Sequence, residues 1–197
     1  MSNPPYPPLA SAAQLAAHLG VESIDPNAAA QALAGASGAV RAFCGWQISQ
    51  VLDDQIVVDG TGTQSFLLPT AHVTQVYWVQ LDYMMLSPVV WDGTQNAQYG
   101  FEWTSSGIIT RAPMWCWPRG ARRITVTLDH GYPVIPDEIT ACTCAVAARA
   151  MDNPESVRMR RVGETAETYD GAALTAYGLS PNDQQTVGRF RISPGRI

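Results

Sequence analysis

The side chains best suited to acid–base chemistry are three histidines and one neighbouring carboxylate. They are His18, His72 and His130, with Asp129 directly before His130. A histidine that met a carboxylate could act as a general base. Neighbouring side chains of a strand point to opposite faces, so we do not expect Asp129 and His130 to form such a pair. We interpret His130, which precedes Gly131, as a turn residue.

The sequence lacks the common motifs of catalysis. It contains no nucleophile elbow, no HExxH and no glycine-rich loop suited to phosphate. We therefore predict that the protein is not an enzyme and that it binds no cofactor.

Two closely spaced cysteines raise the question of a metal site. Cys142 and Cys144 lie in a segment that we predict to be helical. Side chains two residues apart on a helix point in directions about 200° apart, so these two thiols cannot coordinate the same metal ion. We predict that both are small buried apolar residues and that the chain has no metal site. The other two cysteines are Cys44 and Cys116, and all four are expected to be free thiols.

Two tryptophans are candidates for a protein–protein contact. Trp115 and Trp117 stand in residues 113–118, between two predicted strands. This loop either folds back to cap a β-core or presents an exposed aromatic contact, since tryptophan is favoured at interface hot spots. A sugar-binding β-module is a further alternative, although core packing is the commoner use of tryptophan. The six tryptophans are Trp46, Trp78, Trp91, Trp103, Trp115 and Trp117.

Charge and composition exclude several classes. The chain has 197 residues, 46% of them hydrophobic, and a net charge of −5, which argues against a general nucleic-acid binder. All 12 basic residues are arginine. This bias reflects either a GC-rich genome or the use of arginine at fixed interfaces. No apolar run approaches the roughly 20 residues that cross a bilayer, and the proline-rich residues 1–8 do not form a signal peptide. We expect a soluble protein with an N-terminal arm that is ordered only when something holds it.

Three helices are predicted around a β-rich middle. Ser11 and Gln14 have capping-box spacing, and Gly20 suits the end of that helix. The second helix opens at Asp25–Pro26 and ends at Gly45. Its glycines, Gly35 and Gly38, would let another helix approach closely. The third helix runs from near Pro136 to Asp152–Pro154. The predicted apolar stripes are Ala29, Leu33, Ala36, Val40 and Phe43, and Ile139, Cys142, Val146 and Ala150.

Residues 46–131 alternate in the manner of strands. Residues 123–129 predict a half-buried strand, whereas 74–81 carry large apolar groups on both faces and predict a strand covered on both sides. We expect five to seven short strands in a small antiparallel sheet or barrel. The predicted fold is α+β: a small helical bundle with a large antiparallel β insertion and an extended C-terminal arm that ends in a short helix. The predicted parts are an arm at 1–8, a helical core at 9–45 and 132–153, the insertion at 46–131, and a C-terminal arm at 154–197.

The C-terminal arm holds most of the candidate interface residues. Its middle is rich in Gly, Ala and Thr, and a capped helix is predicted from Ser180–Pro181 to about Phe190. So short a helix is marginal alone in water, so we predict that the chain from about Arg158 onward becomes ordered on assembly. The alternative is that it folds back on its own subunit with solvated arginines. The candidate interface residues are Trp115, Trp117, Arg158, Arg160, Arg161, Tyr169, Arg189, Phe190 and Arg191.

A series of short motifs runs along the chain in a fixed order. They are an aromatic-Cys-Gly-Trp segment at 43–46, His-Gly-Tyr-x-x-x-Pro at 130–136, Gly-x-x-x-x-Thr-Tyr at 163–169, Leu-Ser-x-x-Asp at 179–183, and Arg-aromatic-Arg at 189–191. In their order and spacing the chain resembles the head-to-tail connector, or adaptor, proteins of long-tailed, siphovirus-type phages, most closely those of actinobacterial phages. The β insertion is larger here than in the compact members of that family.

This resemblance implies a structural virion protein at the head–tail junction, made in the cytoplasm of a bacterial host. It implies a ring, a dodecamer, beneath the portal protein, with a stopper or tail-side protein docked below. It also implies that DNA passes through the channel without sequence-specific binding, that no membrane is involved, and that the C-terminal segment packs along the portal or a neighbouring subunit. A stopper or tail terminator is the alternative within the same region, but the two-helix start and the long tail favour the adaptor.

Overall fold

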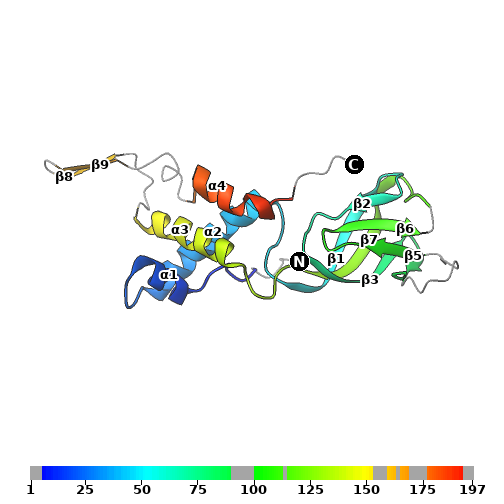
Figure 1. Ribbon diagram of the computed structural model, residues 1–197, viewed down its shortest axis with the longest axis horizontal. Helices are drawn as coiled ribbons and strands as arrows, with labels where there is room; N and C mark the ends of the chain where they lie inside the picture. Colours follow the sequence, from blue (N-terminus) through cyan, green and yellow to red (C-terminus); the bar gives the residue numbers. More distant parts are fainter. Residues whose placement is uncertain are drawn as a thin grey trace. The chain divides into compact units, whose positions relative to one another are not determined.

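The computed structural model describes residues 6–89, 100–112, 115–152, 159–162, 165–168 and 177–192. The chain forms two compact units, with helices gathered in one and antiparallel sheets in the other (Figure 1). The helical unit comprises Met1–Gly45 and Val134–Arg191, and the β-unit comprises Trp46–Pro133 with Ile192–Ile197. The fold is α+β, as predicted from the sequence.

In the described part of the helical unit there are four α-helices and one 3-10 turn. They are α1 (Ala12–Leu19), α2 (Pro26–Cys44), α3 (Asp137–Asp152), α4 (Pro181–Val187) and the turn η2 (Gly188–Phe190). The predicted caps are confirmed: Ser11 and Gln14 form a capping box, the Asp25 carboxylate accepts from two amides at the start of α2, and Gly20 and Gly45 end their helices in the left-handed conformation. Local sequence therefore sets where these helices begin and end.

Small residues bring α2 and α3 together. Ala29, Leu33, Ala36 and Val40 of α2 are buried, and α2 packs against α3. Gly35 has a different neighbour from the one expected. A Cβ atom built there would lie 2.1 Å from the ring of Tyr177, so that ring, rather than another helix, occupies the space beside Gly35. Nothing lies within 4 Å of the corresponding position at Gly38.

The residues just before α1 are held by α2. The amide of Leu9 donates to the Ser37 hydroxyl at 2.9 Å, and the Arg41 guanidinium donates to the carbonyl of Pro7. The same guanidinium lies 5.8 Å from the centre of the Tyr6 ring. Partial burial lowers the pKa of Arg41. The N-terminal segment from residue 6 onward is thus ordered by contacts within its own unit.

The β-unit contains two antiparallel sheets. One has the order β1-β7-β3-β4 and the other β2-β6-β5, so that the described residues of the predicted β zone contain seven strands. Their bounds are β1 Val51–Gly60, β2 Ser65–Leu67, β3 Val73–Leu81, β4 Met84–Leu86, β5 Gly100–Trp103, β6 Ile108–Ala112 and β7 Gly120–His130. A separate hairpin of β8 (Met159–Val162) and β9 (Thr165–Thr168) belongs to the C-terminal part of the chain.

Both sheets contribute to one hydrophobic core. Its fully buried members include Phe101 and Ile109 from the smaller sheet, and Ile124, Val126 and Leu128 from β7. The prediction that the apolar residues of 123–129 face the core is therefore confirmed for Ile124, Val126 and Leu128. Each such side chain contributes roughly 1.5–3 kcal/mol by leaving water.

Strand β3 differs from the prediction that both its faces are covered. The register of β3 against β7 shifts between Val76 and Trp78. Val76 opposes Leu128, and Trp78, two residues later, opposes the adjacent Thr127. The extra residue, Tyr77, breaks the simple alternation, so that Val76 and Val79 both point into the core. Trp78 is consequently exposed.

Three of the four cysteines are buried in helices. Cys44 lies at the end of α2, and Cys142 and Cys144 lie in α3. Burial raises the pKa of Cys44 to about 11 and that of Cys142 to about 12, and it raises the pKa of Cys144 as well. Within the described residues, no group of three or more His, Cys, Asp or Glu side chains could hold a metal ion. No helix in the same part of the chain is long and apolar enough to cross a membrane.

These thiols should react at very different rates. Because the thiolate is the reactive form, Cys116, which is exposed, should be modified rapidly by a disulfide reagent at pH 8, and the buried thiols only after denaturation. Titration with the reagent before and after addition of denaturant measures this directly. Cys116→Ser is the control and should abolish the fast phase. Rapid native-state modification of Cys142 would contradict the packing of α3.

Candidate functional site

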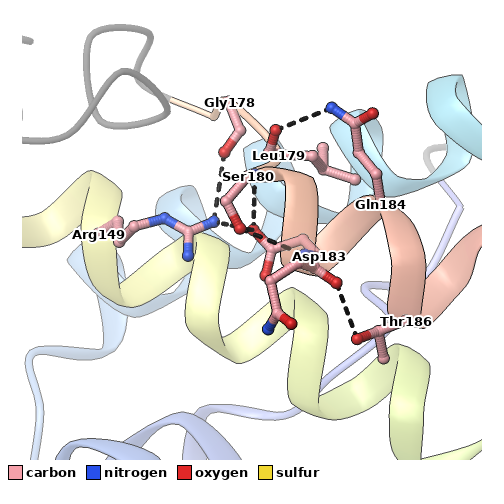
Figure 2. A network of polar contacts seen from close by, with 8 residues as sticks. Arg149, Gly178, Leu179, Ser180, Asp183, Gln184 and Thr186 are labelled. Atoms are coloured by element: carbon pink, nitrogen blue, oxygen red, sulfur yellow. Dashed lines mark hydrogen bonds and ion pairs between the residues drawn. The ribbon is translucent and has the colours of Figure 1, made fainter.

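The C-terminal helix α4 begins with a reciprocal cap. The Asp183 amide donates to the Ser180 hydroxyl at 3.2 Å, and the Asp183 carboxylate accepts from the Ser180 amide and hydroxyl, each at 2.8 Å (Figure 2). Pro181 occupies the first helical position. Residues 180–183 therefore define the residue at which α4 begins.

Arg149 connects this cap to α3. Its guanidinium forms an ion pair with the Asp183 carboxylate and also donates to the carbonyl of Gly178 at 3.3 Å (Figure 2). The Asp183 side chain is only 8% exposed and that of Arg149 is 30% exposed. A carboxylate so deeply buried requires a cation and hydrogen-bond donors, and the cap and Arg149 together supply both.

Apolar and ring contacts complete the attachment of α4. Val187 is fully buried, and its carbonyl lies 4.0 Å from the thiol of Cys44. The Arg191 guanidinium lies 5.4 Å from the centre of the Phe43 ring. Together with Tyr177 against Gly35, these contacts attach the segment 177–191 to both α2 and α3.

The remaining candidates near the C-terminus form local pairs. Arg189 forms an ion pair with Glu138 of α3, and its guanidinium lies 4.7 Å from the centre of the Phe190 ring. Both partners of the ion pair are exposed, which limits its contribution to stability.

This packing differs from the prediction of an arm that needs assembly to become ordered. Residues 177–191 fold onto their own helical unit, which is the alternative weighed above. The reason is the buried Arg149–Asp183 pair together with Val187, which give a short helix the tertiary contacts that it lacks alone.

The other candidates of the arm are described only in part. Arg160 and Arg161 lie in β8, where they oppose Glu167 and Ala166 of β9, so this stretch is a hairpin. Arg158 and Tyr169 lie outside the described residues. The predicted interface roles of all four stay predictions.

The two candidate tryptophans have different surroundings. Trp117 is 0% exposed and belongs to the core of the β-unit, whereas Trp115 is 51% exposed. The ring of Trp117 meets that of Phe66 edge-on at 5.1 Å. The guanidinium of Arg111 lies 5.6 Å from the centre of the Trp117 ring and 5.8 Å from that of Trp115. The loop thus caps the β-core with Trp117, which has no exposed area for a partner, and presents Trp115 beside a cation.

The three histidine side chains have separate surroundings. His130 is buried, with its ring nitrogens 2.7 Å from the Thr70 hydroxyl and 3.0 Å from the Asp54 carboxylate. Asp129 instead accepts from the Tyr77 hydroxyl at 2.7 Å, as expected if neighbours on a strand diverge. His72 stacks on Tyr132 at 4.0 Å, and His18 lies exposed in the last turn of α1.

His130 is not the turn residue that the sequence suggested. It is the last residue of β7, and the following Gly131, with φ +87°, makes the turn. A Cβ atom at Gly131 would lie 2.4 Å from the carbonyl oxygen of Ser49, so only glycine fits there. The network around His130 ties the end of β7 to β1 and to the segment before β3.

Comparison with solved structures gives the fold a counterpart. The chain superposes on a chain from the neck of a native gene transfer agent (GTA) particle, computed with C12 symmetry, with a TM-score of 0.57 and 15% identity over 94% of this chain and 91% of the other. This chain shares its fold with that neck chain. A chain from the neck of an empty GTA particle, computed with C6 symmetry, gives a TM-score of 0.54 and 15% identity over 94% and 92% of the two chains. No family model and no curated protein matches the sequence.

Sequence reasoning missed Arg149, Arg111 and Tyr177. Arg149 lies in the last turn of α3, a helix that the sequence predicts, but its partner Asp183 lies 34 residues away. Nothing in local spacing connects them. The motif at 179–183 was recognised as a helix start, but not as a buried carboxylate that requires a cation.

The attachment of α4 should depend on the buried pair. We expect Asp183→Asn to destabilise the helical unit by about 1–3 kcal/mol, because it leaves the partly exposed Arg149 guanidinium without its carboxylate. Hydrogen exchange of residues 179–191 should accelerate markedly, while α2 keeps its protection. Glu138→Gln removes the exposed pair with Arg189 and is the matched control, with an expected cost below about 1 kcal/mol. Equal effects of both variants would refute a special role for the buried pair.

The tryptophan pair allows a second comparison within one loop. Trp117→Ala should cost about 3–5 kcal/mol of unfolding free energy, since it empties a large volume in a closed core. Trp115→Ala should cost less than about 1 kcal/mol, because its ring is half exposed. Denaturant titration of both variants measures the difference. Similar losses in both would show that Trp115 also supports the core.

Proposed function

We propose that this protein is a head-to-tail adaptor of a phage or phage-like particle. Copies of the chain form a ring, a dodecamer, beneath the portal at the capsid vertex, and the ring carries the stopper and tail below it. The observation that supports this most strongly is the similarity in fold, over 94% of the chain, to a GTA neck chain from a C12-symmetric structure. The ordered motifs that resemble the connectors of long-tailed phages support it independently.

The charge of the chain suits this role. A channel for DNA must let the duplex slide, and every arginine or lysine placed on a phosphate adds affinity that opposes sliding. A subunit with a net charge of −5 offers DNA little to hold. The proposed function requires no catalytic step, no cofactor, no membrane and no sequence-specific contact with DNA.

The candidate residues have distinct roles in this proposal. Trp115 is proposed to contact neighbouring subunits or the portal. The same role is proposed for four residues in and beside the sequence of β8 and β9: Arg158, Arg160, Arg161 and Tyr169. Arg189 and Arg191 first attach the C-terminal segment to its own bundle, and Phe190 lies against the guanidinium of Arg189. Trp117 supports the loop that presents Trp115.

The adaptor and the stopper differ in what they touch. An adaptor ring lies directly against the portal, whereas a stopper or tail terminator lies farther toward the tail. The proposal therefore makes a statement about neighbours that imaging of intact particles can test.

The test is to delete the gene from the particle that encodes it and to image the neck of the complete particle. We expect DNA-filled or emptied heads and separate tails without the protein, because the connection between them is missing. Cryo-electron microscopy of wild-type particles should place a ring of this chain against the portal. Supplying the gene in trans is the control and should restore joined particles. Joined, infectious or DNA-transferring particles without the protein would contradict the proposed function, and a ring separated from the portal would favour the stopper.

A further inference from the structure

All the arginines in residues 46–133 lie toward one end of the β-unit, together with Asp59 and Asp82, and three further carboxylates lie toward the other end. The only arginines in residues 46–133 are Arg111, Arg119, Arg122 and Arg123. They lie beside the end of β1, where Gly60 opposes Gly120. Asp53, Asp54 and Asp129 lie toward the other end, where Asp54 opposes Leu128. Six residues of strand separate these positions, which corresponds to roughly 20 Å.

The arginine end is rigidly built. Arg123 forms an ion pair with Asp82 at the tip of the β3–β4 hairpin, with its Nε 3.0 Å from the carboxylate. This contact lowers the pKa of Asp82 and raises that of Arg123. The amide of Arg122 donates to the Asp59 carboxylate at 2.7 Å. Among the described residues, neither Arg119 nor Arg122 forms an ion pair of its own, and both side chains are exposed.

Exposed large apolar side chains lie on the segments that are hydrogen-bonded to this end of the β-unit. Tyr83, Met84 and Met85 follow one another at the hairpin tip and are all exposed. Trp115 is exposed as well, and its loop is attached to the turn after β1 because the Trp117 amide donates to the Thr63 carbonyl at 2.8 Å. Exposed aromatic, methionine and arginine side chains in one place are the composition of an interface core. We call Arg119, Arg122, Tyr83, Met85 and Trp115 the arginine end.

The opposite end has the complementary character. Leu52 and Asp53 are exposed at the start of β1, and the Asp53 amide donates to the Asp129 carboxylate at 2.8 Å. Strand β1 is the edge of its sheet, since it pairs with β7 alone among the described strands. We call Leu52, Asp53 and Asp129 the acidic end. It offers carboxylates and one large apolar side chain, and among the described residues its histidine, His130, is buried.

We propose that the arginine end of one copy docks on the acidic end of the next copy, so that the β-units form a continuous head-to-tail contact around the ring. This rests on the proposed function, which supplies the ring. A cyclic assembly requires two different and mutually complementary faces on the same chain. The two ends of the β-unit meet that requirement in charge and in exposed apolar groups. Arginine forks pair carboxylates with directional hydrogen bonds, which also sets the register of the contact.

The first test weakens each face separately in the full-length chain. Arg119→Glu with Arg122→Glu, and separately Leu52→Ser with Asp53→Asn, should each raise the protein concentration needed for half-maximal ring assembly by about tenfold or more. Mass photometry over a dilution series measures this. Glu102→Gln removes a carboxylate that belongs to neither end and is the control that should assemble close to wild type. Arg119→Lys with Arg122→Lys keeps the charge but loses the planar fork, so its assembly should be weakened less than that of the double Glu variant. Thermal unfolding identifies any variant that fails to fold, and the variant of the other face then tests the same contact.

Mixing the two weakened variants tests the head-to-tail geometry. Each retains one intact face, so a mixture can make one productive β-unit contact between unlike partners but cannot continue the chain of contacts. We expect a 1:1 heterodimer that forms only in the mixture and that dissociates as salt is raised. A face that paired with itself would instead give homodimers of a single variant.

The outcomes separate this inference from the proposed function. Folded variants of both faces that assemble at wild-type concentrations would overturn the β-unit contact, while a ring at the neck of particles would still support the adaptor. A wild-type chain that is absent from the neck of complete particles would remove the proposed function itself. Loss of assembly in both face variants, with the heterodimer seen only on mixing, would establish the contact.

Discussion

The antiparallel pairing of β1 with β7 is the contact on which the rest of the structure depends. It joins the two ends of a long insertion, where Val51 opposes His130. Beside this pair, the Gln50 amide donates to the Tyr132 carbonyl, and the Tyr132 amide donates to the Ile48 carbonyl. Without it, α2 and α3 would be separated by a long open loop, and their packing would bear the full entropy of closing that loop. The closed insertion therefore serves the helical unit as well as itself. The buried network of His130, Thr70 and Asp54 strengthens the pairing where the strands end.

A second constraint governs the C-terminal segment. The helix α4 is too short to be stable by propensity, so its order comes from the partners that meet it. Asp183 serves both as the cap of α4 and as the carboxylate that pairs with Arg149, which couples local helix formation to tertiary docking. A segment attached through one buried pair and a few apolar contacts is a cooperative element that moves as one piece. In the proposed ring, any contact that α4 makes with a neighbour would start from this docked position.

The β-unit combines a conventional core with an uneven surface. Its interior is filled by both sheets and by Trp117, which explains why the surface can depart from the usual mixture of charges without loss of the fold. The arginines gather at one end and the carboxylates of Asp53, Asp54 and Asp129 toward the other. Self-complementary ends of this kind suit a subunit that meets identical neighbours, because attraction between unlike ends and repulsion between like ends select one orientation.

The sequence by itself determined the local elements. Caps, glycine stops and apolar periodicity located the helices α1 to α4, the α+β class and the half-buried strand β7, because these features depend on residues within one or two turns or one strand. The order of short motifs also indicates a connector-like chain. The tertiary structure decided the long-range matters: the bulge at Tyr77 that exposes Trp78, the separation of Trp115 from Trp117, and the docking of α4 by Arg149. Each of these depends on a partner far away in the sequence, and a local pattern carries no information about which distant residue arrives to pair a charge, to shift a register or to close a core.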